Sequence, residues 1–188
     1  MTTGQTIVNN GVDIEALRDA RTALGEDPSL AQFAWRSTVT WVNGVQSRSE
    51  VESFYGLGGE QGHHIGFTFD ADHPMQFAAT DVGVTPIEFV LVALGSCLTG
   101  GIAAVAQQRD IQLRSVTATI TGAQDLQGIL GIDTEVRNGF SDVSVHYDIE
   151  ADASPEEIKA LVAQSQKRSA VFDIMTNPTD VSVTVSAS

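Results

Sequence analysis

Residues 85–108 read TPIEFVLVALGSCLTGGIAAVAQQ, and this stretch decides the fold. It begins with Pro86, which suits the first position of a helix because the missing N–H costs nothing there. The run carries no charge from Phe89 to Ala106, and it holds Cys97, the only cysteine of the chain. Because such a helix is apolar on nearly every face, we expect it to be buried on all sides.

Three settings would bury this helix: a lipid bilayer, a sheet wrapped around it, or a second copy of the same helix. The uncharged run reaches the lower length limit for a membrane span. However, glycines, Ser96 and Thr99 lower its hydrophobicity, and neither a Lys/Arg cluster nor a Trp/Tyr pair flanks it. We therefore favour a buried central helix over a membrane span.

Small residues recur along one face of this helix at spacings of three and four, namely Ala93, Cys97, Gly100 or Gly101, and Ala104. A stripe of this kind lets another backbone approach closely. The neighbour is either a second copy of the helix or a strand of the same chain, and the spacing does not separate these alternatives.

Length and charge narrow the classes of protein and partner. The 188 residues suffice for one substantial domain, and the net charge of −14 argues against nucleic acid or an anionic membrane surface as a partner. One cysteine cannot form an internal disulfide, and nothing at the N-terminus resembles a signal peptide, so we expect a cytoplasmic protein. We predict a flexible tail over 1–12 and a single domain over 13–188, with a helix at 13–24 before a core at 33–186.

Alternating apolar residues after position 33 predict a β-hairpin that turns at Asn43-Gly44. A two-residue turn there would place Val39 opposite Arg48 and so put Arg48 on the more apolar face, with Arg36 on the other. An arginine on a core-facing side needs an anion. Either Glu50 on the same face or a carboxylate or thiolate of the central helix would supply it.

The remaining pattern completes an α+β domain. Alternation predicts strands near residues 64–70, 111–122 and 140–150, and a last strand that contains Val181, Val183 and Val185. The capping box at Ser154–Glu157 opens a second helix. The order β-β-β-α-β-β-α-β indicates largely antiparallel sheet, in which either an α+β packing or a sheet wrapped around one long helix is allowed. The histidines lack a recognised ligand spacing, and we predict neither a metal nor a cofactor.

Several motifs together resemble the OsmC/Ohr family. They are Thr85-Pro86 with Glu88, the run Ala93–Cys97, Asp125 with Gly128, Gly139-Phe140, and Asn177-Pro178 before the final valines. The resemblance implies an OsmC-like fold and an intertwined homodimer, in which largely antiparallel sheets of both subunits wrap long central helices. It also implies a thiol-dependent peroxidase that reduces organic hydroperoxides in oxidative stress defence.

The resemblance further implies the roles of three residues. Cys97 would attack the peroxide, Arg48 would hold the thiolate with Arg36 in reserve, and Glu88 would orient the arginine. A peroxidatic cysteine must be a thiolate, and Cys97 lies too far along its helix for the N-terminal dipole to help much.

Two positions depart from the family pattern. Ser169 stands where the second cysteine is typical, so an oxidised Cys97 would need an external thiol as reductant. Ile87 follows Pro86, where the organic hydroperoxide resistance branch has its glutamate. The alternative function is a non-catalytic homodimer that binds an apolar small molecule, with Cys97 as a small buried hydrophobe.

Overall fold

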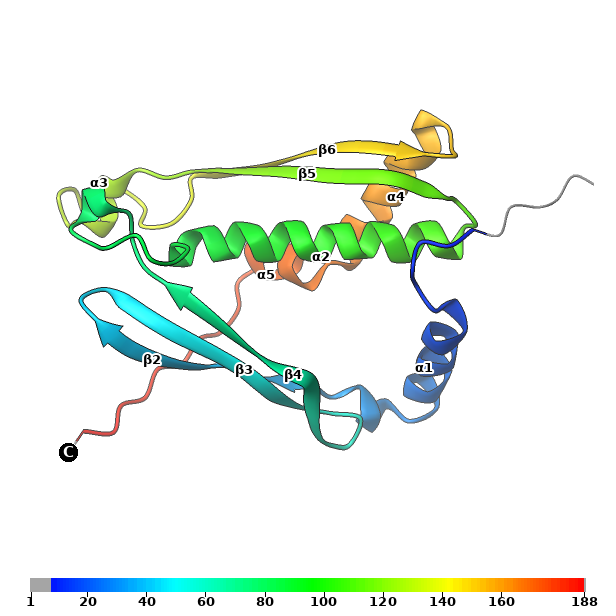
Figure 1. Ribbon diagram of the computed structural model, residues 1–188, viewed down its shortest axis with the longest axis horizontal. Coiled ribbons are helices and arrows are strands. Elements are labelled where there is room, and N and C mark those ends of the chain that lie inside the picture. The colour runs from blue at the N-terminus through cyan, green and yellow to red at the C-terminus, as the bar shows by residue number, and fades with distance from the viewer. Residues whose placement is uncertain (1–7, 188) are drawn as a thin grey trace, which may run out of the picture. The chain divides into compact units, whose positions relative to one another are not determined.

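The computed structural model describes residues 8–187, and these fall into two compact units (Figure 1). One unit is Asp13–Val90, and the other joins residues 8–12 to residues 91–187. Most of the tail predicted over residues 1–12 lies outside the described residues. Of its last part, Asn10 donates its backbone N–H to Gln107 Oε1 at 2.6 Å and accepts from the N–H of Leu113 at 2.9 Å.

The unit Asp13–Val90 is built on one antiparallel sheet. The long strand β3 pairs with β1 and β2 along one edge and with β4 along the other. Asp13 caps the first helix by accepting the N–H of Ala16. The elements are α1 (Ile14–Glu26), η1 (Pro28–Ala31), β1 (Ala34–Trp35), β2 (Thr38–Asn43), β3 (Gln46–Gly56), β4 (Gly59–Ala71) and η2 (Met75–Phe77).

The predicted register of the first hairpin is wrong by one residue. Asn43 pairs with Gln46, so the turn is Gly44-Val45, with Gly44 at a φ of 55° in the first central position. A one-residue slip moves every side chain to the other face. Arg48 consequently lies opposite Thr40 on a polar face instead of opposite Val39.

A second irregularity lies farther along the same strand. The pairing of β3 with β4 shifts between Val51 and Ser53, and this breaks the alternation that would have carried Phe54 onto the face of Arg48. The other face of the sheet carries Val39 and Trp41, which remain 59% and 71% exposed.

Asp72 fixes the irregular connection between β4 and the central helix. Its carboxylate is 1% exposed and accepts the N–H groups of His73, Thr80 and Val82 and the hydroxyl of Thr80. The hydroxyl bond from Thr80 outweighs the effect of burial, and with the three N–H bonds it lowers the pKa of Asp72 to about 2. This segment is therefore held by one ionised side chain.

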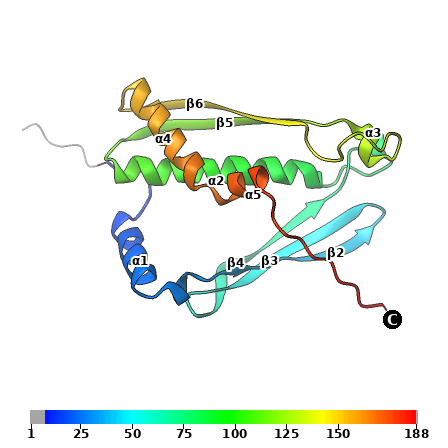
Figure 2. The ribbon, with the colours of Figure 1, turned by 180° about the vertical axis from the view of Figure 1, so that it is seen from behind.

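The other unit is organised around the central helix (Figure 2). The hairpin of β5 and β6 and the helix α4 pack against it, and the core contains Ile102, Val105, Ala106, Ile111 and Leu161. Within this unit, Gly95 lies against Ile120 and Gly101 against Ser165. The elements are α2 (Pro86–Gln108), β5 (Leu113–Ala123), α3 (Leu126–Ile129), β6 (Asp142–Ala151), α4 (Pro155–Arg168) and α5 (Ala170–Thr176).

The helix α2 is buried on one side only, whereas the sequence predicts burial on all sides. Its buried residues are Leu94, Gly95, Leu98, Ile102, Val105 and Ala106, while Val92 is 56% exposed. By length and composition α2 would also suit a membrane span, a test that the core helix of a water-soluble protein passes too. Of the small-residue stripe, Gly101 packs on α4 of the same chain and Gly100 has open space beside it.

The last predicted strand is wrong for the single chain. Residues 177–187 form no regular secondary structure, and Val181, Val183 and Val185 are more than four-fifths exposed. A strand needs a hydrogen-bonded neighbour, and within residues 8–187 this segment is not hydrogen-bonded into either sheet. The other elements confirm the predicted α+β class with antiparallel pairing.

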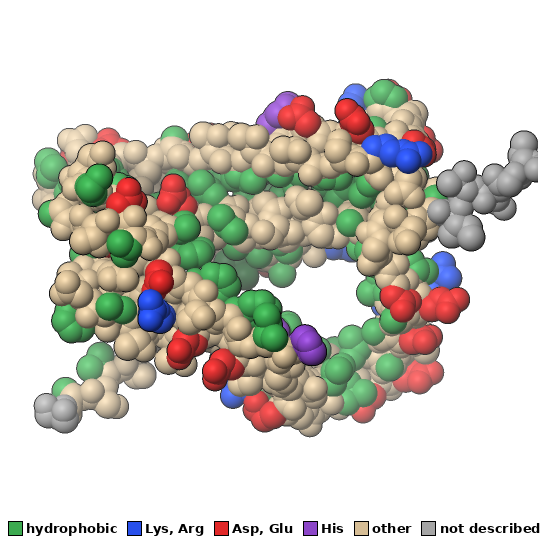
Figure 3. Space-filling view, in the orientation of Figure 1, with side chains coloured by type: hydrophobic (Ala, Val, Ile, Leu, Met, Phe, Trp, Pro, Cys, Tyr) green, Lys and Arg blue, Asp and Glu red, His purple; other side chains and the backbone are tan. Residues whose placement is uncertain are grey.

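The face of the molecule that Figure 3 shows carries more acidic than basic side chains, in line with the net charge of −14.

Candidate functional site

Cys97 lies in the middle of α2, partly exposed, with its sulfur against the joint between α4 and α5. The hydroxyl of Ser169 donates a hydrogen bond to Cys97 Sγ over 3.1 Å. Ser169 is 6% exposed, so this contact is largely shielded from water. The position that the family resemblance marks for a second thiol is thus in direct contact with the sulfur.

Local sequence explains why the chain turns at Ser169. It ends α4, where its N–H donates to the carbonyl of Gln166, and it is also the N-cap of α5, where its Oγ accepts the N–H of Phe172 at 3.1 Å. Serine is among the preferred N-cap residues because its short side chain reaches an otherwise unpaired N–H. A single residue therefore ends one helix, begins the next and contacts the thiol.

The environment of Cys97 favours the thiolate. Burial alone raises the pKa of the thiol, but the hydroxyl of Ser169 and the backbone N–H groups of Val171 and Ala170 lower it more strongly, so the pKa lies below its ordinary value. Each of these donors stabilises negative charge on the sulfur. Among the described residues, the causes of this shift include no cation.

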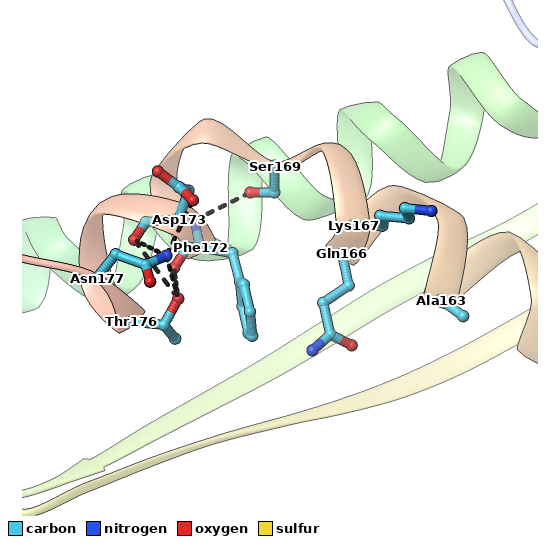
Figure 4. Close-up of a pocket in the computed structure, with 8 residues that line it drawn as sticks. All are labelled: Ala163, Gln166, Lys167, Ser169, Phe172, Asp173, Thr176 and Asn177. Atoms are coloured by element: carbon cyan, nitrogen blue, oxygen red, sulfur yellow. Dashed lines mark hydrogen bonds between the residues drawn. The ribbon is translucent and has the colours of Figure 1, made fainter.

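Two cavities lie beside this joint and share the side chains of Gln166 and Phe172. The first is an open, polar recess of about 360 Å³ (Figure 4), lined by Ala163, Gln166, Lys167, Ser169, Phe172, Asp173, Thr176 and Asn177. The second is a pocket of about 230 Å³ with mostly apolar walls, lined by Leu98, Ile102, Val143, Val145, Tyr147, Val162, Ser165, Gln166 and Phe172.

Arg48 belongs to the unit Asp13–Val90, and its partner there is Asp70. The guanidinium donates to both carboxylate oxygens, from Nε at 2.9 Å and from Nη2 at 3.2 Å, and this pairing raises the pKa of Arg48. Of the two anions that the sequence left open, Glu50 is not the hydrogen-bonded partner, because Asp70 lies directly across the strand pair. The role of Arg48 toward the sulfur remains a prediction. Arg36, the reserve, pairs with Glu60.

Glu88 caps its own helix. Its Oε2 accepts the N–H of Thr85 at 3.1 Å, which satisfies a backbone donor just before the first turn of α2. Glu88 and Cys97 are nine positions apart, so they point to opposite sides of a straight helix. Within the described part of the chain, this arrangement includes no arginine paired with Glu88, so the predicted action of Glu88 on an arginine stays a prediction. Among residues 8–187, no group of three or more His, Cys, Asp or Glu side chains is arranged to hold a metal ion.

Sequence reasoning missed the bond from Ser169 and the two cavities around Phe172. The available signal was Ser169 at the place where the family resemblance implies a second cysteine, since two cysteines that form a disulfide must lie within reach of each other. The donors of Val171 and Ala170 follow from the helix start at that serine.

Comparisons with known proteins agree with this architecture. The profile of the family described as OsmC-like protein matches residues 79–184, more than half of the chain. The search of curated proteins found no match.

Solved structures give fold-level similarity. An OsmC-like protein from Mycoplasma pneumoniae is similar with a TM-score of 0.56 and 16% identity, over 75% of this chain and 86% of that one. An organic hydroperoxide resistance protein OsmC from Legionella pneumophila has a TM-score of 0.52 and 17% identity, over 76% of this chain and 90% of that one. An OsmC-like protein of unknown function from Vibrio cholerae has a TM-score of 0.52 and 12% identity, over 74% of this chain and 91% of that one.

Proposed function

The chain belongs to the OsmC-like protein family, and from that membership we propose that it is a thiol-dependent peroxidase that reduces organic hydroperoxides through Cys97. The observation that carries the proposal is the set of donors around the sulfur, namely the hydroxyl of Ser169 and the N–H groups of Ala170 and Val171. They lower the pKa of the thiol and so raise the fraction that is present as the nucleophilic thiolate at a given pH.

The first step is attack of the thiolate on the terminal oxygen of the hydroperoxide. The O–O bond breaks, the sulfur becomes a sulfenic acid, and the departing alkoxide takes a proton to leave as an alcohol. The apolar pocket, whose lining includes Leu98, the residue after Cys97, offers a place for an organic substituent. This supports an organic hydroperoxide as the substrate.

Arg48 and Glu88 enter the proposal as assisting groups. Arg48 stabilises charge at the peroxide, and Glu88 orients the guanidinium of Arg48. We place them in a homodimer, because the sheet of the unit Asp13–Val90 leaves an apolar face with Val39 and Trp41 exposed. A second copy of the chain covers that face in this proposal. An external thiol then reduces the sulfenic acid, because Ser169 has no sulfur to form a disulfide.

A second candidate function rests on the pocket of about 230 Å³. Its apolar walls suit a small apolar ligand, in which case Cys97 would be an inert residue nearby and the dimer a carrier. The volume is slightly below the usual range for ligand pockets, which favours a small molecule.

The test is peroxide consumption by the full chain with cumene hydroperoxide as oxidant and dithiothreitol as external dithiol. Wild type consumes the peroxide and Cys97→Ser does not, whereas Ser96→Ala, a neighbouring substitution on the exposed side of α2, retains the activity. A wild-type Cys97 that reacts with neither peroxide nor iodoacetamide at neutral pH would refute the peroxidase. Retention of an apolar ligand in native mass spectrometry, with that inert thiol, would support the carrier.

A further inference from the structure

The polar recess beside Ser169 has charged side chains of both signs on its walls. Lys167 and Asp173 both line it, and in the view of Figure 4 they lie on either side of Ser169, with the ammonium of Lys167 at the end directed away from Ser169. The ion pairs found among residues 8–187 do not include Lys167. Asp173 Oδ1 accepts from Asn177 Nδ2 at 2.9 Å, which holds the carboxylate in place.

The recess also adjoins the sulfur through one shared residue. Ser169 lines the recess and its hydroxyl is 3.1 Å from Cys97 Sγ, so a molecule in the recess lies one side chain away from the thiol. The volume of about 360 Å³ is at the lower end for ligand sites, and therefore suits a small ligand.

We propose that this recess binds the external reductant, a small thiol that carries both a carboxylate and an ammonium group, such as an amino-acid or peptide thiol. Lys167 takes the carboxylate, Asp173 takes the ammonium, and Gln166 and Thr176 offer further polar contacts. The net charge of −14 repels a purely anionic thiol, so a recess lined by both a cation and a carboxylate selects a zwitterion.

The chemistry balances with two equivalents of this thiol, and it rests on the proposed peroxidase function. The first thiol attacks the sulfenic sulfur of Cys97, water leaves, and a mixed disulfide forms. The second thiol attacks that disulfide at the bound thiol's sulfur, the symmetric disulfide leaves, and Cys97 returns as a thiolate. The two thiols supply the two electrons that the hydroperoxide consumed.

The test uses thiol–disulfide exchange, because exchange requires the Cys97 thiolate and the recess but no peroxide. The full chain is mixed with cystine, 3,3′-dithiodipropionate or cystamine, and the rate of mixed-disulfide formation at its single cysteine is followed by intact mass. We expect cystine to react fastest. Lys167→Gln slows the two carboxylate reagents about threefold to fivefold, the scale of one exposed ion pair, and leaves cystamine unchanged.

Two variants complete the test. Asp173→Asn slows the two ammonium reagents and spares 3,3′-dithiodipropionate. Arg168→Gln is the matched control. It removes the same charge at the next residue, whose side chain does not line the recess. Equal slowing of the carboxylate reagents by Lys167→Gln and Arg168→Gln, or equal slowing of all three reagents by Lys167→Gln, would overturn the recess as a binding site.

The two proposals fail separately. If cumene hydroperoxide does not oxidise Cys97 but exchange keeps its dependence on Lys167, the peroxidase is wrong and the recess stands as a thiol-binding site. If the peroxide oxidises Cys97 and exchange shows no such dependence, the peroxidase stands and the recess is wrong.

Discussion

Ser169 Oγ lies 3.1 Å from Cys97 Sγ and donates its proton to the sulfur, while the same oxygen accepts the N–H of Phe172. A hydroxyl that accepts from a backbone donor has its own hydrogen directed elsewhere, and here that direction is the thiol. The helix joint thereby orients a donor toward the one sulfur of the chain that can be a thiolate nucleophile.

Ser169→Ala is expected to raise the pKa of Cys97, because it removes a donor that lowers this pKa. Below the pKa the thiolate fraction then falls, and the alkylation rate at pH 7 drops roughly fivefold, the effect of a hydrogen bond worth about 1 kcal/mol. The measurement is the pH dependence of the rate with iodoacetamide. Ser165→Ala is the control, since it also removes a bond from α4 to α2 but touches Leu98 instead of the sulfur. An unchanged profile for Ser169→Ala would contradict this account.

Ser169→Cys is expected to give a disulfide with Cys97 on oxidation. The two side chains already meet, and a small rotation brings two sulfurs to bonding distance. One equivalent of cumene hydroperoxide should remove both free thiols and lower the intact mass by that of two hydrogens, whereas wild type gains an oxygen. Persistence of two free thiols, or of a sulfenic acid beside the new cysteine, would show that the joint holds them apart.

Asp72→Asn is expected to lower the melting temperature by several degrees, because the buried amide cannot reproduce a carboxylate that accepts from three N–H groups and a hydroxyl. The pKa of Asp72 is depressed to about 2, so its contribution to stability is fully present above about pH 4 and is lost as pH falls toward 2. Thermal unfolding between pH 2 and pH 7 measures both effects. Asp81→Asn, on the exposed part of the same segment, should leave the curve unchanged, and an equal loss in both variants would rule out the special role of Asp72.

Gly101→Ala is expected to destabilise the chain by about 1–3 kcal/mol, because a Cβ there would overlap the side chain of Ser165 on α4. Gly100→Ala is the matched change one residue away, where nothing lies within 4 Å of the added atom. It should be neutral or stabilise by up to about 1 kcal/mol through better helix propensity. Urea unfolding of the two variants compares them, and equal stabilities would contradict the close packing of α2 on α4.

Trp41→Glu is expected to split the proposed homodimer. Trp41 is 71% exposed on the apolar face of the sheet, and a carboxylate there would be buried without a partner in a dimer. Light scattering after size exclusion should give twice the chain mass of 19.9 kDa for wild type and a single chain for the variant. Thr40→Glu, on the opposite face of the same strand, is the control and should remain dimeric. A wild type that is monomeric at all concentrations would end the dimer proposal.

Much of the fold follows from the sequence, because it depends on local signals. The uncharged run after Pro86 gives α2, the capping box at Ser154 gives α4, and alternation gives the strand pair β5 and β6. These elements require only periodicity and caps, which neighbouring residues determine.

Local sequence predicts that the first hairpin exists, but it does not determine the register of its strands. Asn43-Gly44 and Gly44-Val45 are alternative turns one residue apart, and the choice between them depends on the whole sheet. The shift between Val51 and Ser53 is likewise a property of the pairing with β4. The hairpin register places Arg48 on a polar face, where Asp70 rather than Glu50 is its partner, and the second shift separates Phe54 from that face.

The final valines show a second reason why the fold could not be predicted in full from the sequence. Alternation at Val181, Val183 and Val185 indicates a strand, yet a strand exists only where another strand offers its backbone, and the described chain offers none there. In the candidate site, sequence identified Cys97 and the unusual serine at 169, but their contact depends on how α4 ends against α2, which no local pattern encodes.

The joint at Ser169 couples two properties that would otherwise vary independently. One hydroxyl both caps α5 and lowers the pKa of Cys97. A substitution of Ser169 that changes the reactivity of the thiol therefore also frays the first turn of α5. Serine is a preferred N-cap residue and cysteine is not, so the substitution Ser169→Cys would weaken this cap while it adds a second thiol beside Cys97. In this chain the serine keeps the helix cap, and under the proposed peroxidase function reduction of an oxidised Cys97 would depend on a thiol from outside the chain.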